Sequence, residues 1–273
     1  MGTEPIVLKD LLAVLAEIAA PALAEPWDNV GLMVGDPNRE ISGVLVALDA
    51  SDQVFTEAQK HGCNVVLTHH PLIFKPLPAV RTDQMTGRLL VRALTEGIAV
   101  VSCHTNLDKV SGGVNDALAA GFKLRDCRVL AGEPEGETGF GRVGKLPAPL
   151  TFAEFIEMLA GVLGLEAVRV AGTPPKTLSR VAVCGGSGSE LAAAAMAAGA
   201  QVFVTGEVKH STARWAEDAG FCIVDAGHFS TEKLVVPGLV AALARTGAAK
   251  GWGLKNIRAT VIEVSPFRYY FRK

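Results

Sequence analysis

Short apolar runs rich in β-branched residues recur along the chain, and each is followed by a turn and then by an alanine-rich stretch with helical spacing. This order predicts βα units, and therefore an α/β fold with parallel or mixed sheets flanked by helices. The clearest predicted strands are Val44–Leu48, Val65–Thr68, Ala99–Ser102, Val181–Cys184, Val202–Thr205 and Ile223–Asp225. A last run, Arg258–Val264, precedes Ser265-Pro266, which favours a strand at a sheet edge.

A glycine- and glutamate-rich connection, residues 132–141, separates two groups of predicted strands. Beyond it, Thr151 and Glu154 have the spacing of a capping box at a helix start. We therefore expect two lobes, residues 1–125 and 126–273, with a possible exchange of terminal segments between them.

The two halves align on each other. Ser42–Asp49 matches Ser179–Gly186, and the same register also places Val65 on Val202, Thr68 on Thr205 and His70 on Glu207. We interpret this as an internal duplication that gives two similar lobes with one site between them. Shared strand and turn preferences are the alternative explanation.

Composition narrows the class of protein. With 49% hydrophobic residues in 273, the chain can bury a large core. Its net charge is -2 and its basic residues are scattered, so the sequence has no basic cluster that would bind nucleic acid. A small-molecule partner is therefore favoured. Charges at Lys9, Asp10 and Glu17 interrupt the first apolar stretch, and no run predicts a membrane span. The five cysteines occur singly, as expected of reduced thiols in a cytoplasmic protein.

Histidines and acids follow three of the predicted strands directly. These segments are His69-His70, His104-Thr-Asn-Leu-Asp108 and His228-Phe-Ser-Thr-Glu232, and they contain four of the six histidines. Open α/β sheets gather their ligands at the carboxyl ends of strands. The three segments are therefore expected to contribute to one site.

We interpret His69, His70, Asp108, His228 and Glu232 as ligands of two divalent metal ions. Imidazole and carboxylate suit zinc, manganese, iron, cobalt or nickel without choosing among them. Adjacent histidines on an extended segment point in opposite directions, which favours two metals over one, and Asp108 and Glu232 are candidate bridges. His104 either ligates weakly or orients Asp108 or a water. Ordinary hydrogen-bonded histidines are the alternative, but the repeated His-x-x-x-acid spacing argues against it.

Three further segments are candidates for catalysis or substrate binding. Glu207 follows a predicted strand and is either a general base or a carboxylate at a helix start. Gly186 and Ser187 lie in a glycine-rich turn that either cradles an anion or is simply tight. Trp27, Asp28 and Asn29 form a polar-aromatic turn that is either a substrate rim or structural.

The chain resembles the Ngg-interacting-factor-three-like family, in the short form without an inserted domain. The resemblance rests on motifs in the family's order: Trp27-Asp28-Asn29-Val-Gly31-Leu, Thr68-His69-His70-Pro71-Leu-Ile, His104-Thr-Asn-Leu-Asp108, Gly139-Phe-Gly-Arg-Val-Gly144, Thr205-Gly-Glu-Val-Lys and Gly227-His228-x3-Glu232. It implies a two-lobed protomer, a homohexamer, and a dinuclear site with the five ligands above, Glu232 bridging and His104 nearby. One departure is Ser211 after His210, where some members have a second histidine.

Members of this family are often labelled GTP cyclohydrolase type 2 homologues. We therefore predict a metal-dependent hydrolase, in which a hydroxide shared by two metals attacks a nucleotide-like or cyclic substrate with help from Glu207 or His104. The rival functions are a non-catalytic metal-binding or metal-delivery protein and a ring-shaped interaction scaffold.

Overall fold

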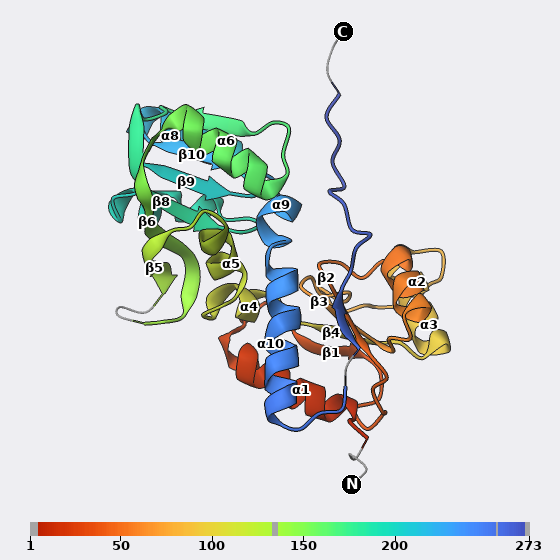
Figure 1. Ribbon diagram of the computed structural model, residues 1–273. Helices are drawn as coiled ribbons and strands as arrows, with labels where there is room; N and C mark the ends of the chain where they lie inside the picture. Colours follow the sequence, from red (N-terminus) through yellow and green to blue (C-terminus); the bar gives the residue numbers. More distant parts are fainter. Residues whose placement is uncertain (1–4, 133–135, 255, 271–273) are drawn as a thin grey trace. The chain divides into compact units, whose positions relative to one another are not determined.

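Two compact units make up the chain, and each contains one sheet. The computed structural model describes residues 5–132, 136–254 and 256–270. Unit 1 comprises Met1–Leu107 and Val236–Glu263, and unit 2 comprises Asp108–Val235 and Val264–Lys273. Helices α4 (Thr105–Lys109) and α10 (Val235–Ala249) carry the chain from one unit into the other (Figure 1). A lobe boundary between residues 125 and 126 stays a prediction.

Unit 1 is built on a five-stranded mixed sheet with the order β1-β4-β3-β2-β11. Strands β2, β3, β4 and β11 run parallel, whereas β1 pairs antiparallel with β4. The strands are β1 Gly31–Val34, β2 Val44–Ala47, β3 Val65–Thr68, β4 Ala99–Ser102 and β11 Ile257–Ala259. A C-terminal strand does lie at the edge of this sheet, as expected, but it is Ile257–Ala259 and not Arg258–Val264.

Helices cover the sheet of unit 1 because its strands are apolar on both faces, as in a buried parallel sheet. Its helices are α1 Leu8–Ile18, the short 3-10 helix Pro21–Leu23, α2 Asp52–Lys60 and α3 Met85–Glu96. One core cluster joins Phe55 of α2 and Leu89 of α3 to Leu45, Val66 and Val100 of the strands. This packing fixes the carboxyl ends of β2, β3 and β4 beside one another.

Unit 2 is built on a six-stranded mixed sheet with the order β5-β6-β8-β9-β10-β7. Its strands are β5 Arg125–Gly132, β6 Gly139–Thr151, β7 Arg169–Gly172, β8 Thr177–Cys184, β9 Val202–Thr205 and β10 Cys222–Asp225. Its helices are α5 Val114–Gly121, α6 Phe152–Leu163, the 3-10 helix Ser189–Leu191, α7 Ala192–Ala197, α8 His210–Ala219 and α9 His228–Glu232. Residues 133–135 of the predicted connection lie outside the described residues.

Two core clusters lie on opposite faces of this sheet. Leu118 of α5 and Phe155 of α6 pack on one face, and Ala195 of α7 and Ala216 of α8 belong to the cluster on the other. The predicted capping box is confirmed: the Thr151 side chain accepts from the backbone of Glu154, whose carboxylate accepts from the backbone of Thr151.

The two sheets share a four-strand pattern. In unit 1 the order is β1-β4-β3-β2, in unit 2 it is β7-β10-β9-β8, and in each the first strand is antiparallel to three parallel ones. Val44 pairs with Val65 in unit 1. The residues aligned with them in the sequence, Val181 and Val202, pair in unit 2. This agreement is what an internal duplication predicts.

Among the residues that the structure describes, no helix has both the length and the apolar character that a membrane crossing requires.

Candidate metal centre

Three histidines of unit 1 come together at the carboxyl ends of β3 and β4. His69 and His70 follow β3, and His104 follows Cys103 after β4. Each offers one ring nitrogen, and these atoms all lie within 4.8 Å of one another. The parallel register places Thr68 beside Ser102, so the residues that follow both strands emerge at the same edge.

The Nδ1 atom of each of these histidines contacts an oxygen of the protein. His69 Nδ1 lies 2.9 Å from the Cys103 carbonyl, His70 Nδ1 lies 2.9 Å from Asp49 Oδ1, and His104 Nδ1 lies 2.7 Å from Asp28 Oδ1. Because these oxygens are acceptors, each Nδ1 carries the hydrogen, and in the neutral ring Nε2 keeps the lone pair. Metal-binding histidines are typically held in this way.

Asp28 is a buried anchor for His104. Besides His104 Nδ1, its carboxylate accepts the Thr105 backbone amide at 3.0 Å and the Thr105 hydroxyl, and its side chain is 0% exposed. Burial would raise the pKa of this carboxyl, but the hydrogen bonds from His104 and Thr105 outweigh burial and lower it. Burial, reinforced by the neighbouring His69, lowers the pKa of His104. Both shifts favour a neutral imidazole held by an ionised carboxylate.

Asp49 is held in place from the C-terminal segment of unit 1. Glu263 accepts the backbone amides of Leu48 at 2.9 Å and Asp49 at 2.8 Å, just beyond the end of β2. Burial raises the pKa of the Glu263 carboxyl despite these bonds. The segment before it is fixed as well, since the buried Glu57 carboxylate accepts the Thr260 hydroxyl and the Val261 amide. Residues 260–263 therefore fix the carboxylate that orients His70.

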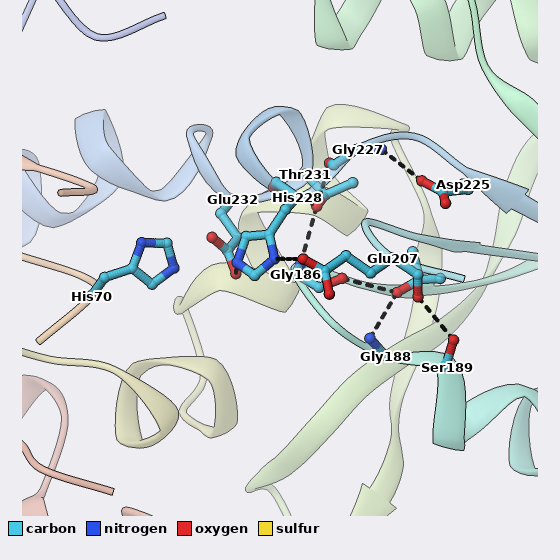
Figure 2. A network of polar contacts seen from close by, with 12 residues as sticks. His70, Gly186, Gly188, Ser189, Glu207, Asp225, Gly227, His228, Thr231 and Glu232 are labelled. Carbon is cyan, nitrogen blue, oxygen red and sulfur yellow. Dashed lines mark hydrogen bonds and ion pairs between the residues drawn. The ribbon is translucent and has the colours of Figure 1, made fainter. Parts of the chain in front are cut away.

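In unit 2, His228 and Glu232 lie one turn apart on α9, as the His-x-x-x-acid spacing predicts. His228 Nε2 lies 3.0 Å from Glu232 Oε1, and its Nδ1 lies 2.8 Å from Glu207 Oε1 (Figure 2). A neutral imidazole has one N–H and cannot donate to both carboxylates. A cation between His228 Nε2 and Glu232 Oε1 would therefore satisfy both atoms, and this cation is either a proton or a metal ion.

Asp225 joins the two segments that form this pair. Its carboxylate accepts the backbone amides of Val208 at 3.1 Å and Gly227 at 3.2 Å, the neighbours of Glu207 and His228 (Figure 2). Glu207 is further held through its carbonyl, which accepts the Ser189 hydroxyl at 2.9 Å. The Glu207 side chain is 56% exposed, and its Oε1 is the oxygen that contacts His228.

The glycine-rich turn after β8 packs tightly against Glu232. Its amides donate to side chains of unit 2: Gly185 to Asn115, Gly186 to Thr231 and Gly188 to Thr205. These bonds use amides that an anion would need, which favours the tight-turn interpretation of Gly186 and Ser187. The Asn115 amide also donates to the Asp108 carbonyl at 2.9 Å, so Asn115 joins α4 to this turn.

The side chains gathered in the two units are donors that suit a divalent metal ion. Three imidazoles converge in unit 1, and an imidazole nitrogen and a carboxylate oxygen lie 3.0 Å apart in unit 2. Oxygen acceptors hold the Nδ1 atoms of all four histidines, so the fixed ring orientation presents Nε2 to a ligand. Thiolate is not part of the set, because burial raises the pKa of Cys103 to about 12. These His and Glu groups can therefore bind metal.

Removing the Asp49 carboxylate is expected to weaken metal binding about 10- to 100-fold, because His70 loses the acceptor that orients its ring. Competition with a chromophoric chelator would measure the affinity of Asp49→Ala. Asp83→Ala is the matched control, since Asp83 is an exposed aspartate of the same unit that pairs with Arg81. Equal affinities for Asp49→Ala and wild type would show that this contact does not support the ligand.

Sequence reasoning missed the residues that orient the ligands. Asp49, Glu263, Asp225 and Asn115 were not candidates, and Asp28 was one only as part of a substrate rim. For Asp49 and Asp225 a signal was present, because both lie at the carboxyl end of an apolar strand: Asp49 shortly after β2, and Asp225 as the last residue of β10. Glu263 bonds to Leu48 and Asp49 more than 200 positions away, and Asn115 bonds to Gly185 70 positions away, so no local pattern marks either residue.

Comparisons with known proteins show the family of the chain. The model of the Duf34/NIF3 (NGG1p interacting factor 3) family matches residues 6–265. A Streptomyces coelicolor protein named GTP cyclohydrolase 1 type 2 homolog is 35% identical over 94% of this chain and 92% of its own length. One of the same name from Clostridium perfringens is 34% identical over 82% and 86%. The crystal structure of a Bacillus cereus protein related to NIF3 is 25% identical, with a TM-score of 0.92 over 98% of this chain and 100% of that one.

Proposed function

Because the chain belongs to the Duf34/NIF3 family, we propose that it binds two divalent metal ions and hydrolyses a nucleotide-like or cyclic substrate. The proposed ligands are His69, His70, Asp108, His228 and Glu232, with Glu232 as the bridge. The observation that carries the proposal is the set of four histidines whose Nδ1 atoms are all held by oxygen acceptors. The relatives named GTP cyclohydrolase 1 type 2 homologues support the substrate class.

The proposal requires the ligands of units 1 and 2 to serve one dinuclear centre. Bound divalent ions would supply Lewis-acid polarisation of a substrate oxygen and activation of a water. Zinc, manganese, iron, cobalt and nickel all suit imidazole and carboxylate ligands.

The protein's own groups would handle the protons. With its Nδ1–H held by Asp28, His104 would accept a proton at Nε2, and the resulting imidazolium would be stabilised by the Asp28 carboxylate. Glu207 would accept a proton at Oε2, the carboxylate oxygen that does not contact His228. Fixed orientation of both groups would keep the acceptor atoms in position between turnovers.

The proposed assembly is a homohexamer in the cytoplasm. All five cysteines are free, which supports a reducing compartment. The hexamer rests on the family resemblance, and light scattering after size-exclusion chromatography would give the mass to compare with a 28.5 kDa protomer.

The variant Glu207→Gln distinguishes a role of Glu207 in catalysis from a role in metal binding. The glutamine carbonyl would still accept the His228 Nδ1–H, so metal content is expected to stay at the wild-type value. Glutamine cannot accept a proton, so turnover on a panel of nucleotides and cyclic esters is expected to fall about 100-fold or more. Exposed Glu157 of α6 offers the matched control, Glu157→Gln.

Two outcomes would change the conclusion. Full turnover in Glu207→Gln would remove Glu207 from the mechanism and leave His104 as the proton acceptor. Wild-type protein that holds metal firmly but turns over no member of the panel would favour the metal-binding or delivery function instead.

A further inference from the structure

Two large aromatic side chains of unit 1 are exposed beside the histidine cluster. Trp27 is 60% exposed and Phe74 is 44% exposed. Their ring centroids lie 5.9 Å apart with an interplanar angle of 70°, and the rings lie 6.4 Å and 6.1 Å from the ring of His104. Exposing a large aromatic side chain forgoes the favourable free energy of its burial, so the pair needs an explanation other than core packing.

Hydrogen bonds fix the segments that carry this pair. Next to Trp27, the Asp28 carboxylate accepts from His104 and Thr105. Asn29 donates its backbone amide to Asp28 Oδ1 at 2.8 Å and its side-chain amide to the Ile73 carbonyl at 2.6 Å, next to Phe74. The hydrogen bonds that begin at the partner of His104, Asp28, therefore continue through Asn29 to the backbone beside both exposed rings.

An exposed aromatic pair on an anchored backbone favours a flat, polarisable ligand. Heteroaromatic rings stack on tryptophan and phenylalanine with little loss of conformational freedom, and every such ring offers a face for this contact. Phosphate groups, being charged and without an apolar face, gain little from an aromatic surface. Because both rings adjoin His104, a ring stacked on them would hold its substituents next to the imidazoles of His69, His70 and His104.

We propose that Trp27 and Phe74 form a docking platform for a planar heteroaromatic ring of the ligand, beside the histidine cluster. This deepens the proposed function, because it assigns recognition of the substrate's ring to two side chains outside the proposed metal ligands. The ring-binding step needs no turnover and can be measured separately from hydrolysis.

Calorimetric titration of metal-depleted and metal-loaded protein tests the platform. The probes are GMP, CMP and flavin mononucleotide, with ribose 5-phosphate as the matched ligand that lacks a ring. At least one ring-bearing probe is expected to bind about 10-fold or more tightly than ribose 5-phosphate. Trp27→Leu and Phe74→Leu are each expected to weaken that binding by about 5- to 100-fold.

Val80→Ala is the control variant, since Val80 is an exposed apolar residue of the loop that follows Phe74, and it should bind as wild type does. The proposal is overturned if no probe binds more tightly than ribose 5-phosphate, or if Trp27→Leu and Phe74→Leu leave the affinity unchanged. It is equally overturned if Trp27→Leu lowers the mass of the assembly, because a second copy of the chain would then cover the pair. Ring-dependent binding without turnover would uphold the platform while rejecting the hydrolase.

Discussion

Gly186→Ala is expected to disrupt the pair that His228 and Glu232 form in unit 2. A Cβ at this position would overlap Glu232 Oε1 and lie 3.3 Å from His228 Nε2, so the carboxylate would have to leave its present position. Gly186 also has a φ of +63°, which costs an alanine about 1 kcal/mol. Overlap with packed atoms adds about 1–3 kcal/mol, so urea unfolding should show a loss of about 2–4 kcal/mol.

The variant Gly220→Ala distinguishes the cost of the positive φ from the cost of the overlap. Gly220 has nearly the same φ, +65°, at the end of α8, but a Cβ there meets nothing within 4 Å. This variant should therefore show only the conformational cost and should keep wild-type metal affinity, whereas Gly186→Ala should bind metal at least about 10-fold more weakly. Equal stability and equal metal affinity for the two variants would mean that Gly186 does not define the Glu232 position.

Regular elements were predictable from the sequence because the parallel strands are buried on both faces. Continuous β-branched runs then mark a strand directly, and Val65–Thr68, Ala99–Ser102 and Val202–Thr205 were predicted to the residue. The C-terminal strand was predicted too long: Arg258–Val264 contains only the end of β11, which the structure assigns to Ile257–Ala259. Beyond Ala259 one backbone bond to β2 remains, from the Thr260 amide to the Val46 carbonyl at 2.8 Å. There the chain is held by the Glu57 carboxylate as well, a contact that no local pattern reveals.

Candidate ligands were predictable for a related reason, since residues at the ends of parallel strands emerge together. His69, His70 and His104 are brought together as expected, and His228 and Glu232 are adjacent on α9. The orienting carboxylates were less predictable. Glu263 reaches Leu48 across more than 200 positions, and such a contact follows from the pairing of β11 with β2, which the sequence did not indicate.

Glu232→Ala is expected to abolish most of the metal binding of the protein. Glu232 is buried, its Oε1 lies 3.0 Å from His228 Nε2, and as the proposed bridge it would be shared by both ions. Removing a bridging carboxylate takes one donor from each ion and uncovers positive charge that the remaining imidazoles cannot compensate. Glu157→Ala is the matched control, because Glu157 is an exposed glutamate on α6.

The most direct measurement is metal content per protomer by elemental mass spectrometry, on wild type, Glu232→Ala and Glu157→Ala purified without a metal-binding tag. Thermal unfolding of each variant would confirm that it is folded. We expect about two metal ions in wild type and Glu157→Ala, falling toward zero in Glu232→Ala. One ion or none in wild type, or a content that Glu232→Ala leaves unchanged, would contradict the ligand set and make the interaction scaffold the leading interpretation.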